Sequence, residues 1–326
     1  MNLIELFDEL EIPNGKEKVF NALHVPDFPN FRIAVDFEGC PVILFSGTNG
    51  IKNIALKNFR LKYLQLQQNV ECKILENGIS SFQTFTVITF TNGDRNLQEY
   101  FLRISETLIK SLSLKPTQQQ VIDSLNKFIE VFRSLTDTPT NTVHGLWTEL
   151  FLIEKSKNPN ILLNYWHQIP EEKFDFNAGN EKIEVKSSSS FERIHTFSSE
   201  QLHPPANTHV LIASIYVRQN NSGLNIQQLI DSIITKIQFN IELSDKLNNL
   251  VCKTLGSSLE QSIKIKFDYN IAKDSLRFYR YQDIIKIEEI HIPSEVFEVR
   301  YKSDLTAISP IDINKITKKG QLFESL

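Results

Sequence analysis

Cysteine is scarce in this 326-residue sequence: Cys40, Cys72 and Cys252 are widely spaced and form no C-x-x-C pair. This pattern predicts neither a zinc cage nor a disulfide framework, so three reduced and mostly buried thiols are expected. No run approaches 18 consecutive apolar residues, and no membrane span is therefore expected. The N-terminus is acidic where a secretory signal peptide needs bases, which favours a cytoplasmic location.

A basic charge balance is also missing, because 35 Lys and Arg residues stand against 39 Asp and Glu residues, a net charge of −4. This disfavours a general polyanion binder, but a local basic face helped by metal ions remains compatible with a nuclease. The sequence has no Walker A pattern, so ATP-driven translocation would need a partner chain. It also lacks the G-x-S-x-G and zinc-deaminase patterns, which disfavours those two enzyme classes.

The length allows two domains, and the sequence pattern changes near residue 138. Residues 1–138 predict a β-rich α+β domain that ends in helices and serves recognition or partner binding. Strands are expected over 31–37, 41–45, 63–75 and 81–90, with turns at Gly39 and Asn77-Gly78, followed by helices over 97–135 that break at Pro116. The polar segment 136–141 is interpreted as the domain boundary.

Residues 139–326 predict a second α/β domain. A helix over 143–155 opens it, and an apolar run over 210–217 predicts a buried central strand. One long amphipathic helix is expected next, because apolar residues recur every four positions from Leu229 to Ile241. From about residue 262 the sequence again predicts strands.

The segment Phe174–Lys186 carries the most informative group of polar residues. Gly179-Asn180 predicts a turn between two antiparallel strands, and strand alternation then places Glu184 and Lys186 on one face. Asp175 lies on the partner strand and can face the same side. Two carboxylates and an ammonium group suit Mg²⁺-dependent phosphodiester hydrolysis, although a surface hairpin with a Glu–Lys pair would give the same pattern.

Two neighbouring segments add candidate residues. Glu149 lies on or beside the apolar face of the 143–155 helix, where an acid needs a metal, a lysine across the site or a surface base as its partner. Four polar side chains after the hairpin are of types that contact phosphates, and we interpret them as substrate-binding residues: Arg193, His195, Ser198 and Gln201. Ser198 is in a position to cap a short helix that contains Gln201. The alternative for this segment is a polar loop that binds no ligand.

The C-terminal segments 277–281 and 299–302 mix bases with aromatic residues. They predict either one side of a DNA groove or two amphipathic edge strands.

The order of these features resembles the restriction-endonuclease core: a helix with Glu149, then Asp175, then Glu184-Val185-Lys186, then an apolar strand and a long helix. The local sequence is similar to a bacterial branch of the PD-(D/E)XK nuclease superfamily whose members occur in restriction and phage-defence gene clusters. The segments that carry this resemblance are H-G-L-W-T-E-L, F-D-F, I-E-V-K-S-S, R-I-H-T-F-S-S-E-Q-L and V-R-Y-K-S-D-L, within about 143–305. Residues 1–138 carry it only weakly.

The resemblance implies that Asp175 and Glu184 bind the metal, that Lys186 is the catalytic lysine and that Glu149 is an auxiliary acid. Gln201 matches a substrate-contacting glutamine of the superfamily. Phe174 stands where the motif name has proline, a position at which the superfamily often varies.

We therefore expect a restriction-endonuclease-like core, with a mixed central sheet flanked by helices and a strand-rich C-terminal extension. The expected activity is DNA hydrolysis with Mg²⁺, for which Mn²⁺ can substitute, in restriction or anti-phage defence. The alternative is an inactive subunit of the same fold that binds DNA or a partner protein in a defence complex. Inactive members normally lose a core residue, and all three candidates are present, which favours the enzyme. One constellation cuts one strand, so a homodimer or a larger complex on DNA is expected.

Overall fold

The computed structural model describes residues 2–14, 19–46, 58–76, 79–112, 116–135, 142–168, 172–316 and 319–326. Contacts divide the chain into two compact units, Met1–Pro139 with Gly256–Glu260, and Thr140–Leu255 with Gln261–Leu326. The expected boundary segment 136–141 and the expected turn Asn77-Gly78 lie outside the described residues. Within the described ranges, no helix has both the length and the apolar character that a membrane span requires.

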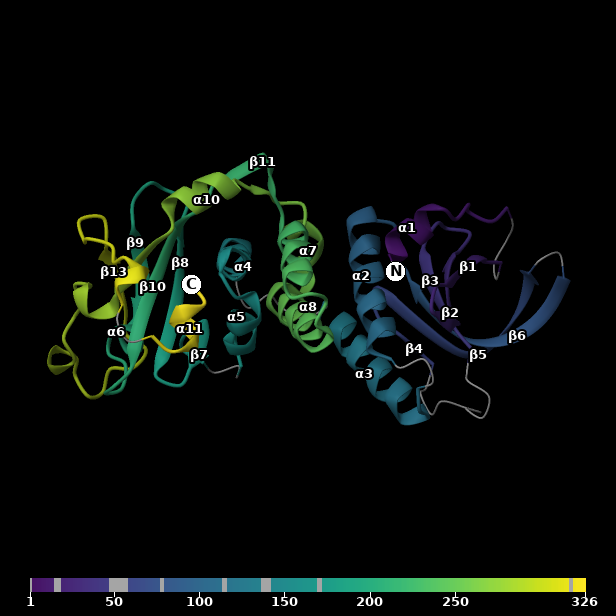
Figure 1. The fold of residues 1–326 in the computed structure, drawn as a ribbon, viewed down its shortest axis with the longest axis horizontal. Coiled ribbons are helices and arrows are strands. Elements are labelled where there is room, and N and C mark those ends of the chain that lie inside the picture. Colours follow the sequence, from purple (N-terminus) through teal and green to yellow (C-terminus); the bar gives the residue numbers. More distant parts are fainter. Residues whose placement is uncertain are drawn as a thin grey trace. The chain divides into compact units, whose positions relative to one another are not determined.

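The first unit contains an antiparallel sheet with strand order β1-β2-β3-β6-β5-β4 (Figure 1). Its elements are α1 (Leu3–Asp8), β1 (Asn21–Val25), β2 (Phe28–Val35), β3 (Pro41–Phe45), β4 (Phe59–Arg60), β5 (Leu64–Glu76), β6 (Ile79–Phe90), α2 (Arg95–Ser111) and α3 (Gln118–Ser134). The expected strands and helices are confirmed, and Gly39 turns the β2–β3 connection at a φ of 78°. Three short elements, α1, β1 and β4, are not predicted by the sequence pattern.

Local signals explain where the helices of this unit begin. The Asp94 carboxylate accepts hydrogen bonds from the first N–H groups of α2, and a capping box between Thr117 and Gln120 starts α3 directly after Pro116. Each helix then packs a phenylalanine ring against Phe90 of β6: Phe101 of α2 stacks on it at 5.1 Å between ring centroids, and Phe132 of α3 meets it edge-on. This aromatic packing holds the helices to the sheet.

The second unit is built on a mixed sheet with strand order β12-β10-β8-β7, in which β8 and β10 run parallel and the other pairs are antiparallel. A two-stranded sheet pairs β9 with β13. The elements are α4 (Val143–Lys155), α5 (Pro159–Tyr165), β7 (Phe176–Ala178), β8 (Glu181–Ser188), β9 (Ile194–Ser198), α6 (Ser199–Leu202), β10 (His209–Tyr216), β11 (Gln219–Leu224), α7 (Ile226–Lys236), α8 (Ile241–Leu255), α9 (Leu259–Ser262), α10 (Tyr269–Ser275), β12 (Arg277–Arg280), β13 (Arg300–Asp304) and α11 (Gln321–Glu324). The first two residues of α9 belong to the first unit.

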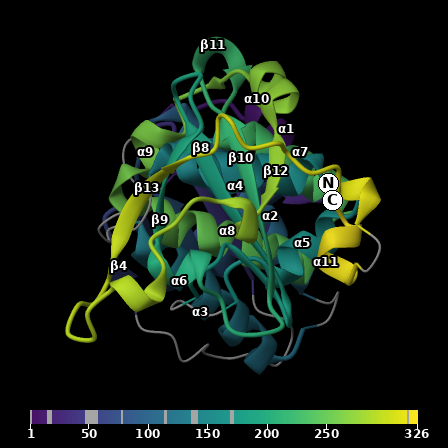
Figure 2. The ribbon, with the colours of Figure 1, turned by 90° about the vertical axis from the view of Figure 1, so that its left-hand side faces the viewer.

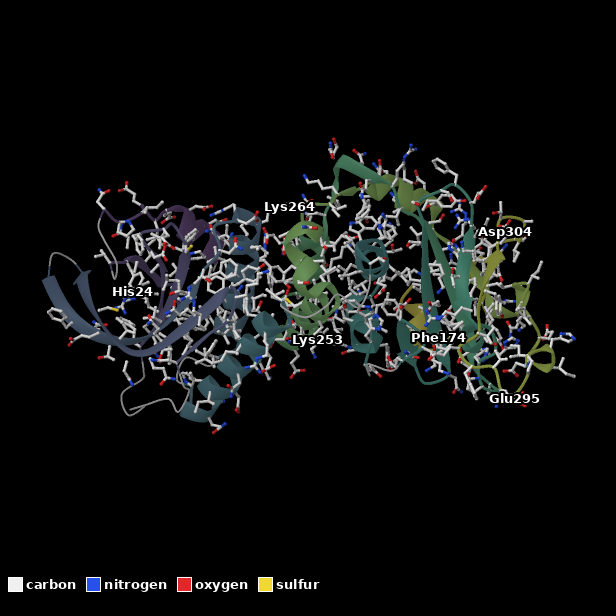
Figure 3. All side chains as sticks on the ribbon, turned by 180° about the vertical axis from the view of Figure 1, so that it is seen from behind. His24, Phe174, Lys253, Lys264, Glu295 and Asp304 are labelled. Atoms are coloured by element: carbon white, nitrogen blue, oxygen red, sulfur yellow. The ribbon has the colours of Figure 1, made fainter. Side chains whose placement is uncertain are left out.

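The mixed sheet lies between two layers. Helix α4 packs against β8 on one face, with α7 behind it, while β9, β13 and α6 cover the other face (Figures 1 and 2). The core between the sheet and this second layer includes Phe174, which Figure 3 labels, together with Phe197, Leu202 and Ile212. Because β10 is flanked by β8 and β12, it is the buried central strand that the sequence predicts.

Two expectations for this unit were wrong. The single long helix is two helices, because Gln238 and Phe239 adopt positive φ values of 54° and 56° and end α7 before α8 begins. The apolar repeat continues across this break, which is why the sequence indicated one helix.

The C-terminal region is also not strand-rich, since its described residues after 262 contain only β12, β13 and isolated bridges as β-structure. Ile285 and Ile290 are of a residue type that favours strands, but both are exposed there and lie in no strand.

Candidate active site

The β7–β8 hairpin places Glu184 and Lys186 side by side. Gly179, at a φ of 58°, forms the turn, and Phe176 pairs with Ile183 across the hairpin. The Lys186 Nζ lies 2.7 Å from Glu184 Oε1, whereas Ile183 is fully buried on the opposite face. The strand alternation expected from the sequence is therefore confirmed.

Asp175 joins this pair from the position just before β7. Its Oδ2 atom accepts a hydrogen bond of 2.7 Å from the backbone N–H of Val185. Its own carbonyl accepts a hydrogen bond from the backbone N–H of His167 at 3.1 Å, next to a β-bridge between Trp166 and Phe176. Three neighbouring chain segments therefore contribute His167, Asp175 and a residue of β8 to one place.

Helix α4 brings a further acid, Glu149, to the same place. Only 3% of Glu149 is exposed, and its Oε2 atom lies 2.8 Å from both the Trp166 Nε1 and the His167 Nε2 atoms. The indole donates to the carboxylate, and so does the imidazole when Nε2 carries its proton. The Glu149 side chain is thus paired with Trp166 and His167.

The surroundings raise the pKa of two of these carboxyl groups, Asp175 and Glu184. Burial raises the pKa of Asp175 well above its usual value, and the charges of Glu184 and Glu149 raise it further, against the Val185 N–H and Lys186. Burial also raises the pKa of Glu184, although Lys186 opposes this. Since one ammonium faces three carboxylates, the group favours a further cation.

The residues present fit a divalent cation. Glu149, His167 and Asp175 each offer one ligand atom, and these atoms lie within 4.8 Å of one another. Glu184 is 5% exposed as a residue, and its Oε2 atom is buried without a hydrogen-bond partner in the described part of the chain. Carboxylate oxygens and an imidazole nitrogen are ordinary ligands for such ions.

A cavity of about 500 Å³ opens beside Lys186. Its lining residues are Lys173, Lys186, Thr196, Ser198, Glu200, Gln201, Glu298 and Arg300. Gln201 connects this cavity to the acid cluster, because its Oε1 atom accepts from Lys186 Nζ at 3.3 Å. Ser198, the residue before α6, donates its backbone N–H to the same oxygen at 3.2 Å. The structure therefore brings the predicted residues Ser198 and Gln201 to Lys186.

Arg193 and His195 have different surroundings. The Arg193 guanidinium is buried and donates to the Ser214 carbonyl and hydroxyl and to the Ser275 carbonyl. The His195 Nε2 atom lies 2.7 Å from the same Ser214 hydroxyl, and burial lowers the pKa of this imidazole to about 4. These contacts tie β9 to β10 and α10, so the geometry supports a structural role for both residues and does not support the predicted phosphate contact.

The C-terminal segments of bases and aromatic residues form strands at sheet edges. β12 is the last strand of the mixed sheet, and β13 pairs with β9. The edge-strand interpretation is therefore confirmed, and Arg300 of β13 also lines the cavity, while a DNA groove stays a prediction.

His167 is the residue of the site that the sequence analysis missed. It lies directly after α5 and its bridge residue Trp166, at a φ of 40° that is uncommon for a residue with a side chain. Such a conformation costs about 1–3 kcal/mol and is often kept at functional sites. A histidine eight residues before Asp175 matches no standard ligand spacing, so only the contacts of the folded chain reveal it.

Residues 3–306 match a family model described as "Putative PD-(D/E)XK family member, (DUF4420)". The chain belongs to the DUF4420 family. The match includes both units and every candidate residue of the site, and the mixed sheet packed against helices is consistent with a PD-(D/E)XK fold. No curated protein and no solved structure matches the chain.

Proposed function

We propose that this protein is a divalent-metal-dependent endonuclease that hydrolyses phosphodiester bonds of DNA. The observation that carries the proposal is the juxtaposition of Asp175 and Glu184 with Lys186, beside a cavity of about 500 Å³. Membership of a PD-(D/E)XK family supports it, because such families typically consist of nucleases. A bound divalent ion polarises a phosphate and lowers the pKa of a bound water, which supplies the nucleophile.

The residues of the chain have separate roles in this proposal. Asp175, Glu149 and Glu184 would hold the ion, because their carboxylates converge and the Oε2 atom of Glu184 has no hydrogen-bond partner among the described residues. The Lys186 ammonium is held between Glu184 Oε1 and Gln201 Oε1, at 2.7 and 3.3 Å. From that position it orients the attacking water and stabilises the charge that develops on the phosphoryl oxygens.

The cavity supports a nucleic-acid strand as the substrate. Lys173, Lys186 and Arg300 supply positive charge along its lining, and Ser198 and Thr196 supply hydroxyl groups. The two acids that share this lining, Glu200 and Glu298, keep the local charge from being uniformly basic. We assign DNA as the substrate and restriction or anti-phage defence as the setting, on the resemblance of the local sequence to that branch of nucleases.

A homodimer, or a larger complex assembled on DNA, follows from the number of sites. Asp175, Glu184 and Lys186 form one constellation, and one such site hydrolyses one strand at a time. A two-fold symmetric dimer would place one site on each strand. Sedimentation of the purified chain with and without a DNA duplex measures this directly, and a strict monomer that linearises plasmid in one step would contradict it.

Cleavage of supercoiled plasmid tests the proposed activity. The full chain is incubated with methylated and unmethylated plasmid in Mg²⁺, in Mn²⁺ and in EDTA, next to the Asp175→Asn variant. We expect nicked or linear DNA with metal and none with EDTA or with the variant. DNA binding without cleavage by the wild-type chain on either plasmid would instead support an inactive subunit that uses this fold for binding.

A further inference from the structure

The imidazole of His167 lies in the site, and the proposed function gives it no role. Its Nε2 atom lies 2.8 Å from Glu149 Oε2 and 3.9 Å from Asp175 Oδ1, so the ring faces both acids. The backbone N–H of the same residue donates to the Asp175 carbonyl, which fixes the segment against β7. Side chain and backbone therefore hold this nitrogen beside the carboxylates of Glu149 and Asp175.

We infer that His167 is a ligand of the metal ion, and that the site accordingly favours first-row transition ions over Mg²⁺; Mn²⁺ serves below as the paramagnetic probe of this class. This inference rests on the proposed function for the presence of a divalent ion, and it goes further by naming a nitrogen ligand and the class of ion. Adjacent ligand atoms around a six-coordinate ion lie roughly 3 Å apart, given metal–ligand distances of about 2.1 Å. The Nε2–Oε2 separation of 2.8 Å is therefore close to what two neighbouring ligands need.

The chemistry of the ligand set selects among ions. Mg²⁺ takes oxygen ligands and keeps most of its waters, whereas imidazole suits transition ions better. The two carboxylates and the imidazole of this site form a mixed oxygen and nitrogen ligand set, which suits transition ions better than Mg²⁺. An independent observation points to an ion at the same place, because Glu184 is buried there with an oxygen that lacks any hydrogen-bond partner within the described residues.

A purely positioning role for His167 is the competing explanation. The ring would then only hydrogen-bond Glu149 and orient it, and oxygen ligands would bind the ion. The two roles differ in whether nitrogen touches the metal. Pulsed electron paramagnetic resonance of bound Mn²⁺ reports this contact, since a coordinated imidazole nitrogen modulates the electron spin echo.

The experiment compares wild-type full-length chain with His167→Gln and a matched control, His209→Gln. A glutamine amide can keep the hydrogen bond to Glu149 but is a poor metal ligand, and His209 is an exposed histidine on β10 of the same unit. Mn²⁺ and Mg²⁺ binding are measured by calorimetry, and the nitrogen modulation is recorded on the Mn²⁺ complexes. Circular dichroism and thermal melts of the metal-free proteins establish that the variants fold.

We expect nitrogen modulation in the wild type and in His209→Gln, and its loss in His167→Gln. Mn²⁺ affinity should fall at least about 10-fold in His167→Gln. Mg²⁺ affinity should change less than about 3-fold, because Mg²⁺ takes oxygen ligands. Wild-type Mn²⁺ binding without nitrogen modulation, or with modulation that persists in His167→Gln, would overturn the inference while leaving the nuclease proposal intact. Nitrogen-coordinated Mn²⁺ in a chain that cleaves no DNA would overturn the nuclease proposal and leave the inference standing.

Discussion

Replacing Asp175 with asparagine should stabilise the metal-free protein while removing its response to metal. The side chain is surrounded by acids, and the ligand atoms of Asp175 and Glu149 lie within 4.8 Å of each other. At an effective dielectric constant of about 20, two like charges at that distance repel by roughly 3–4 kcal/mol. Lys186 and His167 attract the same carboxylate and offset part of this, so we expect a net gain of about 1–3 kcal/mol.

Asparagine is the suitable replacement because its side-chain oxygen can still accept the N–H of Val185. A raised carboxyl pKa means that the folded protein favours the protonated acid. The contribution of Asp175 to stability is therefore fully present below its ordinary pKa of 3.8 and is lost as the pH rises through the raised value. The gain from Asp175→Asn should accordingly be large at pH 8 and should vanish near pH 4.

Scanning calorimetry in EDTA, and then in Mn²⁺ or Mg²⁺, measures both effects. A gain of this size corresponds to roughly 3–10 °C in the melting temperature of a unit of about 150–250 residues. The control is Asp283→Asn, which makes the same chemical change at an exposed position of the second unit. Metal should stabilise the wild type and this control but not Asp175→Asn. A destabilised Asp175→Asn at pH 8, or one with the wild-type response to metal, would refute the electrostatic reasoning.

Three further predictions concern single residues of the second unit. Lys186→Ala should reduce plasmid cleavage by about 10²–10³-fold with folding and DNA binding retained, whereas Lys253→Ala, an exposed lysine on α8 (Figure 3), should cleave normally. His195 has a pKa of about 4 in the folded chain against 6.5 ordinarily, so its contribution to folding stability is present above pH 6.5 and is lost as the pH falls toward 4. Between pH 7.5 and 4.5, the free energy of unfolding in urea should therefore fall by about 2–3 kcal/mol more for the wild type than for His195→Gln. Glu181→Ala should cost about 2–4 kcal/mol in the same assay, because the buried carboxylate accepts three backbone N–H groups at the start of α11. An unchanged stability in that variant would show that water replaces the carboxylate.

The parts of the site that the sequence predicts are those encoded within a few residues of each other. Helix α4 spans 143–155 as expected, because Thr142 caps it and its apolar residues recur at helical spacing. The Glu184–Lys186 pair follows from alternation along one strand, and the turn follows from Gly179. Such local rules need no knowledge of the rest of the fold.

The remaining features depend on contacts between distant segments. Arg193 is of a residue type that commonly contacts phosphate. In the folded unit, however, its guanidinium is buried and donates its N–H groups to Ser214 and Ser275. His167 reaches the site only because Trp166 bridges to Phe176. Residue type alone cannot distinguish a buried structural cation from a ligand-binding one, since both need the same donors and differ only in what the fold packs around them.

The charge of the site explains why these distant contacts matter. Three carboxylates that converge from α4, β8 and the residue before β7 oppose folding unless their surroundings hold them in place. The surroundings do this with fixed donors: the Val185 N–H on Asp175, the Trp166 indole on Glu149 and the Lys186 ammonium on Glu184. These donors position each acid but leave a net negative charge at the centre, where the ring of His167 faces two of the acids. A fold that retains this excess charge gains stability whenever a divalent cation binds, so metal affinity and the folding stability of this unit are coupled.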